Sequence, residues 1–225
     1  MKYSNEFLIG KFIKRYKRFF VDCEYNGEIL TAYNPNTGSM RGLLNKGCKV
    51  ALSKSDNPTR KLKYTVEAFE LDSYWVYTNT VNINNIVKKG IEDGIISEFK
   101  RYTYLKPEYK IDDSRIDFYI EKKDEKYLVE VKNVTLLYQN TAYFPDTITK
   151  RGSKHLKLLS KFAKNGFKCF ILYIVGVDAD SFKCADFIDR DYCMAYNEAI
   201  ENGVNKLLYK HIFDPIKRIS NIVPF

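Results

Sequence analysis

Two acidic residues and a lysine near the middle of the chain have the types and spacing needed for metal-assisted chemistry. Asp117 lies in segment 114–121, and Glu130 and Lys132 form an E-x-K triplet in segment 126–133. Both segments alternate apolar and polar residues, as strands do when successive side chains point to opposite faces. Four polar residues separate the two segments, which predicts a hairpin. In that hairpin Asp117 lies directly opposite Glu130.

The two carboxylates need a positive charge between them. Directly opposed residues have Cβ atoms about 4.5–5.5 Å apart, and two ionised carboxyl groups so close repel each other. Mg²⁺ and Mn²⁺ prefer oxygen ligands, so Asp117, Glu130 and the carbonyl of Val131 are predicted metal ligands. Lys132 is predicted to orient an attacking water or to stabilise charge on a phosphate. The alternative is a solvated sheet face with an incidental Lys–Glu pair.

The rest of residues 81–225 predicts the elements that hold this hairpin. Apolar residues recur at helical or strand spacing, with glycine after two of the helical segments. We expect the order α-β-β-β-α-β-α-β, an α/β (α+β) domain with a central buried strand at 168–177. The predicted helices are 84–93, 149–164 and 190–201, and the other strands are 101–105, 114–121, 126–133 and 206–213.

Residues 1–80 predict a separate small β-domain. Asn26-Gly27 stands between two apolar segments and is a strong signal for a two-residue hairpin turn. Five short strands in this span favour a closed barrel of the OB type. They are expected at 18–25, 29–33, 49–53, 63–69 and 74–78.

The charge balance favours an anionic partner. The 225 residues include 37 Lys/Arg and 28 Asp/Glu, a net charge of +9. DNA or another nucleic acid is expected ahead of a membrane surface, and generic solubility is the alternative. No apolar segment is long enough for a signal peptide or a membrane span. The five cysteines are scattered without a CxxC pair, so we expect free thiols in a cytoplasmic protein.

Five basic residues of the first domain are the predicted DNA contacts. They are Arg15, Lys17, Arg18, Arg60 and Lys61. They could follow a phosphate backbone, or they could protect a solvated strand edge from aggregation. Residues 36–39 form a polar loop that could also reach nucleic acid.

Other titratable residues are weaker candidates. Glu98 could add an acidic ligand but is expected to be a solvated residue at a helix end. Lys154 and His155 lie on the helix after the E-x-K strand, where they could contact phosphate or form an exposed basic face. His211 is expected to be structural.

Several long runs of sequence resemble the sugar fermentation stimulation protein A family. In the first domain they are NPNTGSM (34–40), LSKSDNP (52–58) and RKLKY (60–64), and in the second SRIDF (114–118), VEVKNVTL (129–136), FPD (144–146) and TKRGSKHL (149–156). The resemblance covers nearly the whole chain. It implies an OB-like DNA-binding domain at 1–80 and a restriction-endonuclease-like domain of the PD-(D/E)xK type at 81–225.

In that superfamily the Asp and the E-x-K lie on adjacent strands of an αβββαβ core, and Asp117, Glu130 and Lys132 match them. Ile116 replaces the proline that precedes the Asp. The resemblance leaves two functions open. One is a Mg²⁺-dependent DNA nuclease, and the other is a DNA-binding transcriptional regulator of sugar metabolism with a vestigial nuclease fold. The sequence gives no information on oligomeric state.

Overall fold

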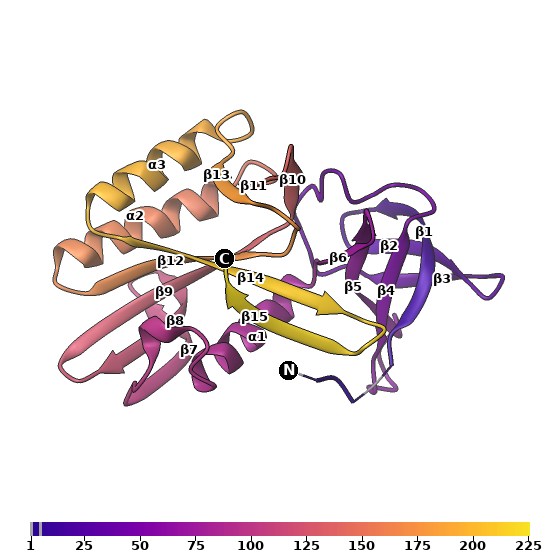
Figure 1. Cartoon of the computed structure of the whole chain (residues 1–225), viewed down its shortest axis with the longest axis horizontal. Helices are drawn as coiled ribbons and strands as arrows, with labels where there is room; N and C mark the ends of the chain where they lie inside the picture. Colours follow the sequence, from indigo (N-terminus) through magenta and orange to yellow (C-terminus); the bar gives the residue numbers. More distant parts are fainter. Residues whose placement is uncertain (1, 5) are drawn as a thin grey trace.

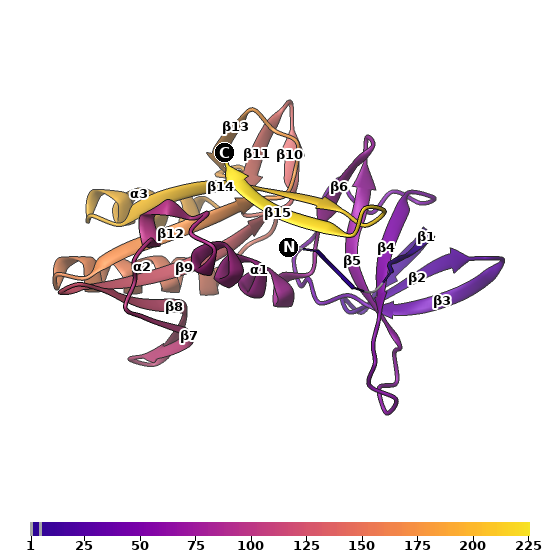
Figure 2. The same ribbon diagram turned by 60° about the horizontal axis from the view of Figure 1, so that its bottom comes forward.

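The computed structural model describes residues 2–4 and 6–225. A β-barrel and a sheet covered by helices lie side by side, with β14 and β15 reaching from the sheet toward the barrel (Figure 1, Figure 2). This is the predicted arrangement of an OB-like barrel followed by an α/β domain. No helix among these residues is long and apolar enough to cross a membrane.

The barrel is built from antiparallel neighbours in the order β3-β2-β1-β4-β5, closed by a parallel contact between β3 and β5. Asn26 and Gly27 both have positive φ, 53° and 84°, so the predicted hairpin turn is confirmed. The strands are β1 (Leu8–Tyr16), β2 (Phe20–Tyr25), β3 (Glu28–Tyr33), β4 (Lys49–Lys54), β5 (Tyr64–Leu71) and β6 (Tyr74–Tyr77), the last an extension beside β5.

The second domain has a six-stranded mixed sheet in the order β15-β14-β12-β9-β8-β7. Its helices are α1 (Thr80–Glu92), η1 (Ser97–Phe99), α2 (Lys150–Lys164) and α3 (Arg190–Glu201). Its strands are β7 (Tyr104–Ile111), β8 (Ser114–Lys122), β9 (Glu125–Val134), β12 (Lys168–Val175), β14 (Asn205–Asp214) and β15 (Ile219–Pro224). A small separate sheet contains β10 (Leu136–Tyr138), β11 (Thr141–Phe144) and β13 (Ser181–Cys184).

Both faces of the main sheet are covered, α1 lying on one side and α2 and α3 on the other (Figure 1). Phe118 and Val129 pack in one buried cluster with residues of α1. Leu128 packs in the other cluster with Leu156 and Leu159 of α2. The alternative of a solvated face beside Glu130 is therefore wrong, because α2 covers that face.

The structure differs from the prediction at several elements. The short strands β10, β11 and β13 and the last strand, β15, are additional to the predicted order. β1 is absent from the prediction, because its basic residues Lys11, Lys14 and Arg15 resemble a solvated segment. The edge strand β7 lies later than the predicted 101–105, and Pro107 within it pairs with Phe118. Proline is tolerated there because an edge strand leaves half of its N–H groups unpaired. α1 begins four residues early, where the Asn79 side chain accepts a hydrogen bond from the N–H of Asn82.

The expectation of five free cysteines is wrong for two of them. Cys184 at the end of β13 and Cys193 on α3 form a disulfide with their Cα atoms 5.8 Å apart, a normal separation for such a bond. The chain folds back between β13 and α3, which brings together two cysteines nine residues apart. Cys23, Cys48 and Cys169 are free.

Candidate active site

The β8–β9 hairpin has the predicted register. Its pairs extend from Lys122–Glu125 at the turn to Phe118–Val129, so the ladder of backbone hydrogen bonds between the two strands ends one residue before Asp117 and Glu130. The N–H of Val131 donates to the Asp117 carboxylate instead of to a backbone carbonyl. Its Oδ2 accepts the Val131 N–H at 2.7 Å, while Oδ1 accepts a hydrogen bond from Asn84 of α1 at 2.8 Å.

Asp117 is held in an environment that disfavours its charge. Burial is the largest influence and the nearby Glu130 carboxylate the second, and together they raise the pKa of Asp117 to about 6. The hydrogen bonds from Val131 and Asn84 and the charge of Lys132 oppose this shift. A carboxyl group that titrates near neutrality beside a second carboxylate is typical of a functional site.

Glu130 is 3% exposed and is contacted by two residues through one of its oxygens. Lys132 Nζ and His155 Nδ1, the latter on α2, each lie 2.5 Å from Glu130 Oε1. Burial pushes the pKa of Glu130 up, but the charge of Lys132 and the His155 contact outweigh it and the pKa is lowered. The other oxygen, Oε2, is buried and has no hydrogen-bond partner among the described residues. Such an orphaned carboxylate oxygen is costly unless something binds it.

The donor set fits a hard divalent cation. A carboxylate pair with one unpartnered oxygen is the kind of ligand that Mg²⁺ and Mn²⁺ prefer. Within residues 2–4 and 6–225, no group of three or more His, Cys, Asp or Glu side chains is arranged to hold a metal. A cation here would therefore take its remaining ligands from backbone carbonyls, such as the predicted Val131, from water or from a substrate phosphate.

The carboxylates open into a cavity of about 300 Å³ between the two domains. Its walls come from the barrel loop after β3, from α1, from β9 and from the segment leading into α2. The polar lining residues are Asn36, Thr37, Thr80, Asn84, Asn133, Thr135, Asp146, Thr147, Thr149 and Arg151, with Asp117, Glu130 and Lys132. The site is thus built by both domains.

The barrel loop is fixed against the second domain by Asp146. Its Oδ2 accepts the Met40 N–H at 2.8 Å, and its carbonyl accepts the Ser39 hydroxyl at 2.5 Å. A Cβ on Gly38 would lie 2.6 Å from Asp146 Oδ1, so a larger residue could not be placed there without displacing the contact. The glycine of the 36–39 loop is therefore required by the junction between the domains.

Arg15, a predicted DNA contact, uses its guanidinium to donate hydrogen bonds to this same loop. It donates to the carbonyls of Asn36 and Gly38, both at 2.8 Å, and to that of Arg18. Its contact with DNA stays a prediction. In the structure, Arg15 holds the 36–39 loop in place through these hydrogen bonds.

The other predicted DNA contacts lie on one end of the barrel. Lys17 and Arg18 are exposed in the β1–β2 turn. The Arg60 guanidinium lies 5.5 Å from the Tyr33 ring centre, and Tyr33 stacks on the half-exposed Phe19. Lys61 is exposed next to Arg60. Stacked aromatic rings among cations suit nucleic-acid bases and phosphates.

Comparison with known proteins identifies the family. The profile described as the SfsA N-terminal OB domain matches residues 13–78, and that described as the sugar fermentation stimulation protein RE domain matches residues 82–217. The chain belongs to the SfsA family. A sugar fermentation stimulation protein homolog of Pelagibacter ubique is 45% identical over 93% of this chain and 92% of that relative. One of Syntrophotalea carbinolica is 40% identical over 96% and 94%.

A solved structure confirms the SfsA fold. The structure of Pyrococcus furiosus SfsA in complex with Ca²⁺ covers 100% of this chain and 96% of its own, with a TM-score of 0.92 and 24% identity. At that identity the likeness is evidence for the fold. The family profiles independently identify an OB domain and an endonuclease-type domain in this chain.

Sequence reasoning missed part of this SfsA-family site. Asn84 was missed because a helical Asn carries no signal of its own, and Asp146 because its contacts come from the barrel. His155 is not part of an exposed basic face, one of its two predicted roles, because it is buried against Glu130. Glu98 accepts a hydrogen bond from the Tyr209 hydroxyl at 2.7 Å. His211 is buried with Nε2 2.7 Å from Ser220 Oγ, a structural arrangement.

Proposed function

We propose that this SfsA-family protein is a DNA nuclease that uses Mg²⁺ or Mn²⁺ at Asp117, Glu130 and the carbonyl of Val131. The observation that carries the proposal is the buried Oε2 of Glu130, which has no hydrogen-bond partner among the described residues. Next to it lies Asp117, whose pKa is raised by burial and by the Glu130 carboxylate. Bound there, the cation would supply Lewis-acid activation of a phosphodiester and of water. The Ca²⁺ complex of the Pyrococcus relative agrees with an oxygen-ligand site in this family.

The chain's own residues divide the remaining work. Asn84 and the Val131 N–H hold the Asp117 carboxylate in one orientation. His155 and Lys132 hold Glu130 through Oε1, which leaves Oε2 without a hydrogen-bond partner among the described residues. The Lys132 ammonium also provides a positive charge where negative charge develops on a phosphate. The barrel grips DNA through Lys17, Arg18, Arg60 and Lys61, in the cytoplasm where DNA is found.

The test is cleavage of supercoiled plasmid by the purified protein with Mg²⁺, Mn²⁺ or chelator. We expect nicking with metal, none with chelator and none from Asp117→Ala, which should still bind DNA because it removes no phosphate contact. DNA binding without metal-dependent cleavage under any of these conditions would refute the nuclease and favour the regulator. Loss of binding together with cleavage in a folded Asp117→Ala variant would contradict the separation of the two roles.

A further inference from the structure

A second depression adjoins the carboxylate cavity on the side away from the barrel. It lies between the β7–β8 hairpin and the first turns of α2. Its lining residues are Lys110, Asp113, Ser114, Arg115, Arg151, Lys154 and His155. Arg151 lines both depressions, and His155, which contacts Glu130, forms part of the wall of the second. The two spaces are therefore neighbours around the same catalytic carboxylate.

The second depression concentrates positive charge that has no partner. Four of its seven residues are cationic, and one, Asp113, is acidic. None of the four cations takes part in an ion pair or a side-chain hydrogen bond with any residue in 2–4 or 6–225. Nearby on the same helix, by contrast, Lys161 pairs with Asp112 at 2.6 Å. Unpaired cations gathered in a hollow create a field that attracts an anion.

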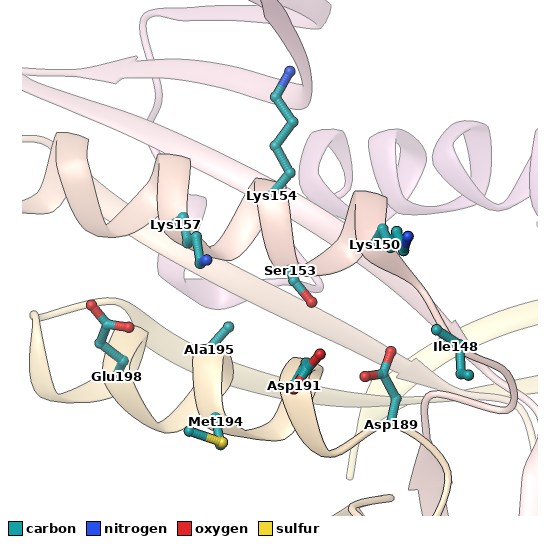
Figure 3. A pocket seen from close by; sticks show the side chains of 10 residues that line it. All are labelled: Ile148, Lys150, Ser153, Lys154, Lys157, Asp189, Asp191, Met194, Ala195 and Glu198. Carbon is teal, nitrogen blue, oxygen red and sulfur yellow. The ribbon is translucent and has the colours of Figure 1, made fainter.

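The cations come from two sides of the hollow. Lys110 and Arg115 are directly paired across β7 and β8. Arg151 and Lys154 are three residues apart on α2, so they lie on one face of the helix. Figure 3 shows the Lys154 side chain leaving α2 on the side away from α3, whereas the opposite face of α2 meets the acidic residues of α3.

A third depression continues the line on the barrel side. Arg15 and Arg18 form its end, and it shares Thr37, Gly38 and Thr149 with the carboxylate cavity. Three adjoining hollows therefore run from the barrel turn to the β7–β8 hairpin. The cavity that holds the carboxylate pair shares lining residues with both of the other hollows, and each of these is lined by cations.

We propose that one phosphodiester strand occupies this line, and that Lys110, Arg115 and Lys154 bind its phosphates on the side of the carboxylates away from the barrel. The cleavage at the centre rests on the proposed function, whereas binding by these three residues does not. The endonuclease-type domain then has a DNA-binding surface of its own, in addition to the one proposed on the barrel.

The test compares two triple variants. One is Lys110→Ala/Arg115→Ala/Lys154→Ala. Its control is Lys126→Ala/Lys164→Ala/Lys206→Ala, which removes the same net charge from exposed positions at the start of β9, the end of α2 and the start of β14. Fluorescence anisotropy of labelled single-stranded and duplex oligonucleotides in chelator gives affinity against salt. Circular dichroism checks that both variants fold.

Each lost phosphate contact lowers the salt slope by about 0.7 on single strands and about 0.9 on duplex. We expect the first triple to lose about two units of slope on a single strand, or close to three on a duplex, and the control to lose none. The arm that shows the loss identifies the strandedness of the bound DNA. Equal slopes for both triples on both DNAs would overturn the proposal. Because binding is measured without cleavage, a wild type that never cuts DNA would refute the nuclease and leave this result standing.

Discussion

Among residues 2–4 and 6–225, each domain buries one glutamate, and the two differ in how their carboxylate oxygens are hydrogen-bonded. Glu67 on β5 of the barrel is 6% exposed and receives a hydrogen bond on both oxygens. Ser53 donates to Oε1 at 2.6 Å, while Tyr77 and Asn79 donate to Oε2 at 2.7 and 2.9 Å. Burial outweighs these donors and raises the pKa of Glu67. This carboxylate is enclosed and fully satisfied by neutral donors.

Glu130 has two cation-capable partners on one oxygen and none on the other. Its pKa is lowered, so it stays ionised despite burial. A buried carboxylate that is fully paired stabilises the junction at which Asn79 begins α1. A buried carboxylate that is half paired, ionised and open to a cavity is prepared for a ligand. The difference in hydrogen bonding is what distinguishes Glu67, which we expect to be structural, from Glu130, which we propose as a metal ligand.

We expect the largest difference between substitutions of the two glutamates in the rate of DNA cleavage. Glu130→Gln should reduce metal-dependent nicking of plasmid by at least about 100-fold, since it removes an anionic ligand and the partner of Lys132. Glu67→Gln should cleave within a few-fold of wild type at a temperature where it is folded. Nicking rates at matched protein concentration measure both. Equal losses in the two variants would show that the contrast between them has no functional meaning.

Metal stabilisation should separate them next. A cation that binds the folded protein stabilises it by about 2.7 kcal/mol at 100 times its Kd. We expect Mg²⁺ or Mn²⁺ to raise the melting temperature of wild type and of Glu67→Gln by similar amounts. Glu130→Gln and Asp117→Asn should show little increase. A wild-type melting curve that is unchanged in millimolar Mg²⁺ and Mn²⁺ would argue against a metal at this hairpin.

In the absence of metal, we expect substitution of Glu67 to destabilise the fold more than substitution of Glu130. Glu67→Gln places an NH₂ group against donors that need an acceptor, which should cost about 1–3 kcal/mol in the free energy of unfolding. Glu130→Gln should cost less, because its amide oxygen can still accept from Lys132 and His155 in place of Oε1, and Oε2 has no partner to lose. Urea denaturation in chelator measures both values. A larger loss for Glu130→Gln would mean that its pairing with Lys132 and His155 is mainly structural.

The contrast also shows how far sequence reasoning reached. Local patterns carry the register of the β8–β9 hairpin, because alternation and the length of the polar turn are properties of adjacent residues. The same patterns correctly predict α2, α3 and the Asn26-Gly27 turn. The basic residues of β1 make it resemble a solvated segment, since nothing local shows that β2 and β4 will flank it.

What the sequence could not predict depends on distant contacts. His155 is 25 residues from Glu130, and Asn84 is 33 residues from Asp117. Neither residue type at its position indicates which carboxylate it meets. Glu67 was not singled out at all, because its donors converge from β4, β6 and the start of α1. The coverage of the Glu130 face by α2 is likewise a tertiary fact.

His211 provides the finest test of the rule that an unpartnered atom marks a site. Its Nδ1 is buried without a hydrogen-bond partner among the described residues, as is Glu130 Oε2. The His211 ring, however, packs edge-on against Tyr77 at 5.0 Å between the two domains. Burial lowers its pKa to about 3. We therefore expect a structural histidine that must stay neutral.

The sign of the pH effect follows from that shift. The unfolded histidine takes up a proton below about pH 6.5 and the folded one does not, so the stability it contributes is present above pH 6.5 and is lost as pH falls toward 3. Between pH 7.5 and 5.5 the wild type should lose about 1 kcal/mol relative to His211→Gln, which cannot titrate. Urea denaturation of the two proteins at each pH measures this difference, and groups common to both cancel. A constant difference would show that His211 takes up its proton at the same pH in the folded and unfolded states, and its buried ring would then require a partner for the charged form.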